Sequence, residues 1–143
     1  MEKKKKRINS RQKGAAGERE LSNFLKLHGW QARRGQQFSG GTDSPDVVSN
    51  FPFHIECKRV QNLDIGDAYE QALRDANDKV PASVIHRKDR EDWLATIELK
   101  EFLELGFDSK VRAVLHKEGA HWLVTLPLLD LLDGIDSKLI DSL

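Results

Sequence analysis

Hydrophobic positions near the start of the chain follow first a helical pattern and then an alternating one. Over residues 15–28, leucine and phenylalanine recur at the spacing of one helix face, and Gly29 stands where such a helix would end. Residues 30–34 then predict a short strand. The segment 35–44, "GQQFSGGTDS", is polar, has no periodicity and predicts a loop.

The next segment predicts two strands and a second helix. Residues 46–49 and 53–60 are typical of strands, and the turn "NFP" between them predicts a hairpin. Asp64 is suited to cap a helix in which alanines recur at helical spacing. Together these elements predict an α/β fold, with a mixed, mostly antiparallel central sheet flanked by helices.

The second half of the chain contains an internal repeat. Val84–Leu103 and Val114–Leu132 match with one residue deleted in the turn. Seven positions are identical: Val84/Val114, His86/His116, Trp93/Trp122, Leu94/Leu123, Thr96/Thr125, Leu99/Leu128 and Leu103/Leu132. Each copy predicts strand, polar turn, strand and short helix, a unit that extends a sheet or supplies an oligomer contact. We expect the tryptophans to be packing anchors and the two histidines to be strand residues, not metal ligands.

Composition indicates a single domain outside membranes. The chain has 143 residues, of which 38% are hydrophobic and 32% charged, as in soluble globular proteins. No apolar run reaches the roughly 18 residues of a membrane helix, and no apolar segment follows the basic N-terminus as in a secretory signal. The single cysteine, Cys57, suits a reducing cytosol. With five scattered histidines, it gives no zinc-ligand spacing.

The net charge of zero conceals a strong asymmetry. Residues 1–60 hold 13 basic and 6 acidic residues, a balance of +7, and residues 61–143 hold the remaining 10 and 17, a balance of −7. Seven of the positive charges lie in residues 1–13, which predicts a flexible basic arm. Such an arm is either a solubilising tail or a nucleic-acid-binding element, and the basic excess beyond it favours nucleic acid.

The predicted hairpin would bring charged side chains together. Residues two apart in a strand share a face, so His54, Glu56 and Lys58 lie on one side of their strand. If residues 50–52 form the loop, Asp46 lies directly opposite Glu56, with its Cβ atom roughly 4.5–5.5 Å away. Two carboxylates and an ammonium group would then share one surface.

This combination predicts metal-assisted hydrolysis. Two carboxylates at that distance repel each other unless a cation lies between them, and Mg²⁺ favours one or two carboxylates together with phosphate oxygens. Such an ion polarises a phosphodiester and favours deprotonation of water. Lys58 would orient or help deprotonate that water, or stabilise the negative charge of the transition state.

Simpler interpretations of the same residues exist. "PD" is a common turn dipeptide, and an E-x-K triplet occurs by chance on solvated strands. The conjunction of Pro-Asp, hairpin and "IECK" in a basic half of the chain favours a nuclease site over a solvated sheet face. Glu18 and Glu20 both flank the apolar stripe of the first helix, and periodicity alone does not choose between them.

The residues resemble a known family. "SPD…IECK" resembles the PD-(D/E)xK nuclease signature, and "KGAAGEREL" followed by "LHGW" is similar to the N-terminal segment of archaeal and phage-type Holliday junction resolvases. The resemblance runs from about Lys13 to Leu105. It implies a restriction-endonuclease-like core over residues 14–105, with residues 106–143 as an appended extension that repeats the 84–103 hairpin–helix unit.

The resemblance also implies roles for individual residues. Glu18 matches a helix glutamate that supports the metal site indirectly, which would settle the choice against Glu20. Asp46 and Glu56 match metal ligands, with the backbone carbonyl of Cys57 as a third. Lys58 matches the catalytic lysine, and Gln71 lies where many such nucleases carry a supporting glutamine. The implied cofactor is Mg²⁺, for which Mn²⁺ would substitute.

The implied partner is branched DNA, which homodimers of these resolvases cut with two active sites on opposite strands of a four-way junction. Arg19 and Arg34 fall where such resolvases contact DNA phosphates. The full predicted DNA-binding set is Lys5, Lys6, Arg7, Arg11, Lys13, Arg19, Arg33, Arg34 and Arg59.

The sequence therefore predicts a Mg²⁺-dependent, structure-selective DNA endonuclease of recombination and repair. Its expected substrate is the Holliday junction, and its expected location is the cytoplasm of a bacterial, archaeal or phage-infected cell. One alternative is a restriction, homing or repair nuclease of the same superfamily that acts on duplexes or flaps. The other is a non-catalytic DNA-binding module.

Overall fold

A computed structural model describes residues 10–35 and 46–141, with side chains over residues 14–35 and 46–136. The elements, in chain order, are α1 (Ser10–Leu27), β1 (Ala32–Arg34), β2 (Val47–Ser49), β3 (His54–Arg59), α2 (Ile65–Ala76), β4 (Ala82–Arg87), β5 (Leu94–Glu98), α3 (Leu99–Leu105), β6 (Val114–Glu118), β7 (His121–Pro127) and α4 (Leu128–Asp141).

A five-stranded sheet of order β3-β4-β5-β7-β6 forms the centre of the molecule, and β1 and β2 form a separate two-stranded sheet. Strands β3 and β4 are parallel, and the other three pairs of the large sheet are antiparallel. The predicted α/β fold, with a mixed and mostly antiparallel sheet flanked by helices, is therefore confirmed.

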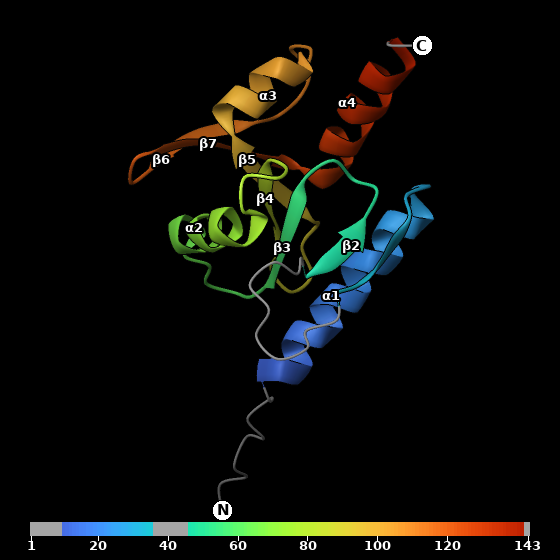
Figure 1. Cartoon of the computed structure of the whole chain (residues 1–143), viewed down its shortest axis with the longest axis vertical. Helices are drawn as coiled ribbons and strands as arrows, with labels where there is room; N and C mark the ends of the chain where they lie inside the picture. Colours follow the sequence, from blue (N-terminus) through green and yellow to red (C-terminus); the bar gives the residue numbers. More distant parts are fainter. Residues whose placement is uncertain (1–9, 36–45, 142–143) are drawn as a thin grey trace, which may run out of the picture.

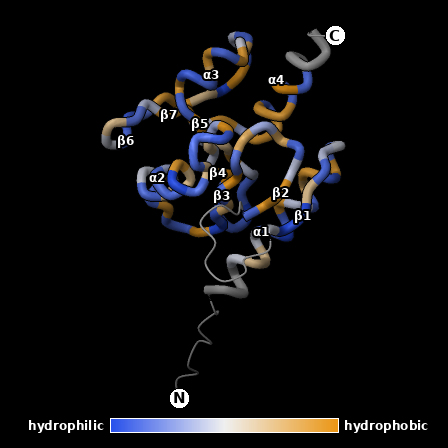
Figure 2. Tube along the Cα trace, in the orientation of Figure 1, coloured by the Kyte–Doolittle hydropathy of each residue, from blue (hydrophilic) through white to orange (hydrophobic). Residues whose placement is uncertain are grey.

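Helices cover both faces of this sheet (Figure 1). The larger apolar cluster joins α1 and α4 to one face, to which the sheet contributes Ile55, Ile85 and Ile97. A smaller cluster joins α2 to the opposite face through Ala72 and Val84. Hydrophobic positions recur along α3, α4 and the central strands, whereas α2 and the connecting loops carry many hydrophilic ones (Figure 2). Within the described ranges, no helix has the length and apolarity to cross a bilayer.

The predicted hairpin between residues 46–49 and 53–60 is wrong. Strand β2 pairs in antiparallel register with β1, and β3 pairs with β4. Two contacts explain the difference: the rings of Trp30 and Phe51 pack edge to face at 5.9 Å, and the amide of His54 donates to the carbonyl of Pro81. The ring contact favours the pairing of β2 with β1. The hydrogen bond from His54 to Pro81 joins the start of β3 to the start of β4.

The two predicted helices are present, with one boundary shifted. Asp64 caps α2, where its Oδ1 accepts the amide of Asp67 at 3.1 Å, as predicted. Helix α1 begins at Ser10, within the predicted basic arm and five residues before the predicted start at residue 15. Residues 10–14 carry no apolar side chain, so periodicity could not reveal this first turn.

Both copies of the repeat adopt the predicted strand–turn–strand–helix order, and they meet about a local two-fold axis. Their inner strands β5 and β7 pair with the equivalent residues Thr96 and Thr125 in register, and the two hydroxyl oxygens lie 2.7 Å apart. The histidines of the outer strands repeat this symmetry, since His86 Nε2 lies 2.8 Å from Thr96 Oγ1 and His116 Nε2 lies 2.9 Å from Thr125 Oγ1. Both histidines are strand residues, as predicted.

The two tryptophans of the repeat differ. Trp93 is 5% exposed and is a packing anchor, as predicted, but Trp122 is 49% exposed, so the prediction is wrong for the second copy. Trp122 lies next to the edge strand β6, where the Lys117 ammonium group lies 5.7 Å from its ring. The same residue is thus buried in the inner copy and exposed at the edge of the sheet.

Candidate active site

Strand β3 holds a carboxylate and an amine beneath α2. Glu56 is 2% exposed, and its Oε1 lies 3.3 Å from the Nζ atom of Lys58, which remains partly exposed. The same Nζ atom donates to Oε1 of Gln71 at 3.4 Å. Gln71 lies on α2, so this contact connects the helix to the charged end of the strand. The side chains of Glu56, Lys58 and Gln71 therefore lie together at this end of β3.

Asp46 reaches β3 from the start of β2 without a hairpin ladder. Its backbone amide donates to the carbonyl of Ile55 at 3.1 Å, and its Oδ2 accepts the amide of Cys57 at 2.9 Å. Burial, and after it the negative charge of Asp46, raises the pKa of Glu56 to about 8, although Lys58 opposes the shift. The structure thus brings Asp46 and Glu56 close enough to repel, although by a route different from the predicted hairpin.

The two candidate glutamates of α1 have different partners. Glu18 is 6% exposed, and its Oε2 accepts the Nε–H of Arg34 at 2.9 Å. Burial raises the pKa of Glu18, the hydrogen bond from Arg34 lowers it, and the charge of Asp46 raises it again. Glu20 instead pairs with Arg59 and Arg87. Of the two glutamates, only Glu18 therefore lies in the electrostatic environment of Asp46. Glu18 is also the glutamate that the resemblance selects.

A glycine allows α1 to approach β3 closely. A Cβ atom at Gly17 would lie 3.0 Å from the Cβ atom of Arg59, closer than side chains normally pack. At Gly14, one turn earlier, a Cβ atom would meet nothing within 4 Å. The glycine before Glu18 thus sets the distance between helix and strand and brings the glutamate to Arg34 and Asp46.

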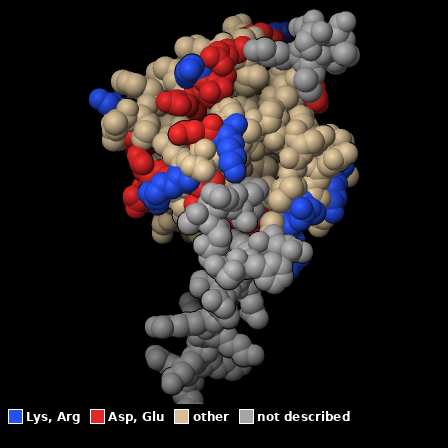
Figure 3. Space-filling model, in the orientation of Figure 1, with Lys and Arg blue, Asp and Glu red and all other residues tan. Residues whose placement is uncertain are grey.

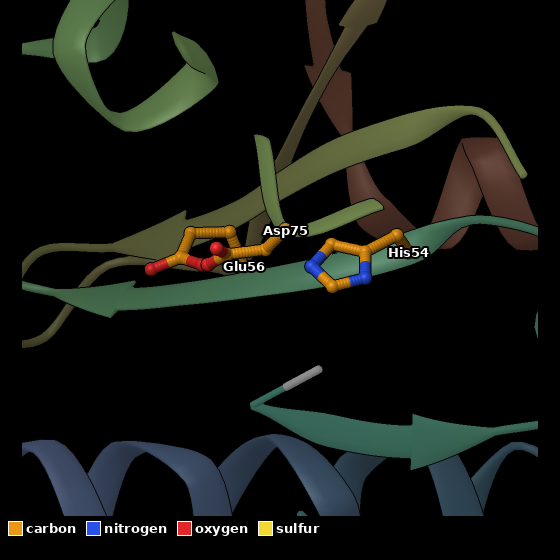
Figure 4. A group of neighbouring side chains, drawn as sticks. All are labelled: His54, Glu56 and Asp75. Carbon is orange, nitrogen blue, oxygen red and sulfur yellow. The ribbon is translucent and has the colours of Figure 1, made fainter. Parts of the chain in front are cut away.

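Two residues of this region were not among the predicted site residues. His54 and Asp75 lie with Glu56, and the nearest ligand atoms of the three side chains are within 4.8 Å of one another (Figure 4). Two sequence signals could have found them. His54 alternates with Glu56 on one strand face, and Asp75 is four residues after Gln71 on α2, which places both on one side of the helix.

The residues around Asp46 and Glu56 fit a hard divalent cation. A buried carboxylate with a raised pKa next to a second carboxylate gains most from a positive charge, because the ion relieves both desolvation and repulsion. Asp46, Glu56 and the backbone carbonyl of Cys57 offer the oxygen donors that Mg²⁺ prefers. Burial raises the pKa of the Cys57 thiol well above its usual value, so its sulfur stays protonated and is a poor ligand.

The predicted DNA-binding residues have varied surroundings. Arg19, Arg33 and Arg34 are exposed, and Arg34 also forms a salt bridge with Glu18. Arg59 is held by Glu20 at 3.3 Å and by Asp89 at 3.2 Å. Lys5, Lys6 and Arg7 lie outside the described residues, as do the side chains of Arg11 and Lys13. In Figure 3, basic side chains gather over α1 and β1, and acidic ones gather over α2 and α3.

Comparison with known proteins agrees with the resemblance. Residues 9–72 match the family of archaeal Holliday junction resolvases (Hjc). Among solved structures, the chain is similar to the 1.6 Å structure of Hjc from Archaeoglobus fulgidus, a Holliday junction resolvase from an archaeal hyperthermophile. The two are 21% identical, the match covers 82% of this chain and 86% of that chain, and the TM-score is 0.46.

No curated protein matches the chain in sequence. The family match spans Glu18, Asp46, Glu56, Lys58 and Gln71. The resemblance predicted from the sequence is thus confirmed over residues 9–72, the part of the chain that matches the archaeal Holliday junction resolvases.

Proposed function

We propose that this chain is a Mg²⁺-dependent DNA endonuclease that hydrolyses phosphodiesters in four-way junctions. The observation that carries the proposal is the convergence of Asp46, Glu56 and Lys58 at one end of β3, within the segment that matches a resolvase family. Two carboxylates and an ammonium group in one partly buried place suit phosphodiester hydrolysis better than a solvated strand would.

Each residue has a distinct role in the proposed reaction. Asp46 and Glu56 hold the divalent cation, which when bound would polarise the phosphodiester and favour deprotonation of the attacking water. Lys58 orients that water or helps to remove its proton, and it stabilises the charge that develops on the phosphate oxygens. Gln71 holds the Lys58 ammonium group in place through the 3.4 Å hydrogen bond. Glu18 acts indirectly: it accepts the hydrogen bond of Arg34, and its carboxylate lies within the electrostatic influence of Asp46.

Affinity for DNA comes from the basic N-terminal half, and selectivity comes from junction shape. Arg19 and Arg33 are exposed and form no salt bridge within the described part of the chain, so they can contact phosphates directly. Phosphate contacts release counterions, so binding weakens steeply as salt increases. They carry no base information, so the shape of the branched substrate must provide the discrimination. The proposal includes a homodimer, because two sites are needed to cut opposite strands of one junction.

Cleavage of a labelled synthetic junction tests the proposal. The wild-type protein should cut the junction with Mg²⁺ and leave it intact with a chelator. Lys58→Ala should slow single-turnover cleavage by about 100- to 1,000-fold, the usual effect of removing one group that stabilises developing charge. Lys110→Ala, which removes an exposed lysine of the loop after α3, is the matched control and should cleave normally.

The same assay separates the alternatives when a flap and a linear duplex are included. A resolvase cuts the junction faster than either, whereas equal rates on all three substrates would favour a general nuclease of the superfamily. DNA binding without Mg²⁺-dependent cleavage of any substrate would favour the non-catalytic module.

A further inference from the structure

The interface between β3 and α2 contains a buried histidine with an unmet polar atom. His54 is 6% exposed, and its Nε2 atom has no hydrogen-bond partner among the described residues. One ring nitrogen of His54 points toward the side chains of Glu56 and Asp75 (Figure 4). Buried polar atoms without partners are rare in native proteins, and each calls for an explanation such as an ion.

Two carboxylates complete the surroundings of this nitrogen. Glu56 comes from the same strand and Asp75 from α2, and the nearest ligand atoms of all three side chains lie within 4.8 Å of one another. When ionised, a carboxylate can only accept hydrogen bonds, so neither carboxylate can donate a hydrogen bond to the other. A cation among the three would accept a lone pair from each and would remove the repulsion between the acids. Asp75 is only partly buried, which leaves an entry path from solvent.

We propose that His54, Glu56 and Asp75 bind a first-row transition-metal ion of the Mn²⁺, Co²⁺ or Zn²⁺ class. An imidazole nitrogen with two carboxylates suits these ions, whereas Mg²⁺ prefers oxygen donors and retains several waters. This donor set therefore differs from the set of Asp46, Glu56 and the Cys57 carbonyl. The ion would join α2 to β3, and through Glu56 it would adjoin the proposed cleavage site.

The three ligands do not follow a zinc-ligand spacing, so no metal-binding motif identifies this site in the sequence. His54 and Glu56 are two residues apart on a strand, and Asp75 follows nearly twenty residues later on a helix. Only the packing of α2 against β3 brings the third ligand into place. Binding of the metal ion to these three residues can be measured without DNA, so it can be tested separately from the proposed cleavage.

Titration of chelator-treated, full-length protein with Co²⁺ tests the proposal, since Co²⁺ absorbs visible light when protein ligands bind it. The background is Asp46→Asn, which disables the proposed Mg²⁺ site. We expect one Co²⁺ per chain and competition by Zn²⁺. His54→Gln and Asp75→Asn should weaken binding at least as much as the loss of an outer-shell partner does, which is roughly 10- to 100-fold. His86→Gln, which removes a half-buried histidine of the neighbouring strand β4, is the matched control and should bind normally.

A second measurement on the wild-type protein covers the case in which a variant fails to fold. Pulsed electron paramagnetic resonance of bound Mn²⁺ should detect one coordinated imidazole nitrogen, retained in His86→Gln and absent in His54→Gln. Absence of nitrogen coupling in the wild type, or Co²⁺ affinity unchanged in His54→Gln, would overturn the proposed metal site. Loss of Mg²⁺-dependent junction cleavage with intact Co²⁺ binding would instead reject only the proposed function.

Discussion

The two edges of the large sheet are built in opposite ways. At one edge, β3 lies between α1 and α2, and it buries the charged Glu56 and the polar His54. At the other edge, β6 exposes the apolar side chains of Val114 and Leu115. The β3 edge thus buries polar residues and the β6 edge exposes apolar ones, which is the reverse of the usual distribution in a folded protein. Burial of charge costs free energy, so the β3 edge is where a function is most expected.

The repeat sharpens this contrast because its two outer strands, β4 and β6, carry identical residues, and only β4 is covered by a further strand, β3. Val84, in the strand next to β3, is fully buried, whereas its equivalent Val114 is 65% exposed on β6. The sequence of the unit determines its strand and helix order, but its position in the sheet determines what is covered. The following predictions test how far the two edges differ, from the largest expected effect to the smallest.

The largest difference should appear between the two equivalent tryptophans. Trp93 is buried and lies under the guanidinium group of Arg87, so Trp93→Ala should lower the free energy of unfolding by about 3–5 kcal/mol. Trp122→Ala at the exposed edge should cost less than about 1 kcal/mol. Urea unfolding of both variants measures the difference. Equal losses would mean that the edge copy is covered in solution, as in an oligomer.

The buried charge of Glu56 should make stability depend on pH. Its folded-state pKa of about 8 lies above the ordinary 4.5, so the folded protein binds this proton more tightly than the unfolded chain does. That contribution is complete below pH 4.5 and is lost as pH rises to about 8, and each unit of pKa difference is worth about 1.4 kcal/mol.

Urea unfolding of chelator-treated protein between pH 4.5 and 8 measures this contribution. Wild type should lose stability relative to Glu56→Gln as pH rises, and saturating Mg²⁺ should reduce the loss because the ion favours the ionised carboxylate. The exposed Glu91 provides the control variant Glu91→Gln, which should retain the wild-type slope. A wild-type slope in Glu56→Gln would show that another group carries the effect.

A smaller effect should distinguish two glycines of α1. Gly14→Ala adds a methyl group in open space and should stabilise the helix by up to about 1 kcal/mol. Gly17→Ala gains the same helix propensity but pushes against Arg59, and such overpacking typically costs about 1–3 kcal/mol. Gly17→Ala should therefore be less stable than Gly14→Ala in thermal unfolding. Equal stabilities of the two variants would contradict the close approach of α1 to β3 at Gly17.

Local patterns were enough to predict much of the fold. The cap at Asp64 located α2, and the repeat located four strands and two helices. The partner of β2 could not be predicted, because alternation identifies a strand but not its neighbour. Pairing with β1 depends on the contact between Trp30 and Phe51, which are 21 residues apart in the chain.

The candidate site was predictable where it depends on strand alternation. Glu56 and Lys58 lie two residues apart on β3, and their contact follows from that spacing. The choice between Glu18 and Glu20 depends on the packing of α1, which periodicity does not resolve to one residue. The spacing of Asp75 from Gln71 places both on one side of α2, but Asp75 reaches the site only because α2 packs against β3, a tertiary contact that local patterns do not predict.

The central claim is that Asp46 and Lys58 act in one reaction at the β3 edge. Single-turnover cleavage of a four-way junction by Asp46→Asn, Lys58→Ala and the double variant tests it most directly. Residues that act as a unit are not additive, so the double variant should cleave no more slowly than the slower single variant. Rate losses that multiply in the double variant would mean that the two residues act independently, which would contradict the account.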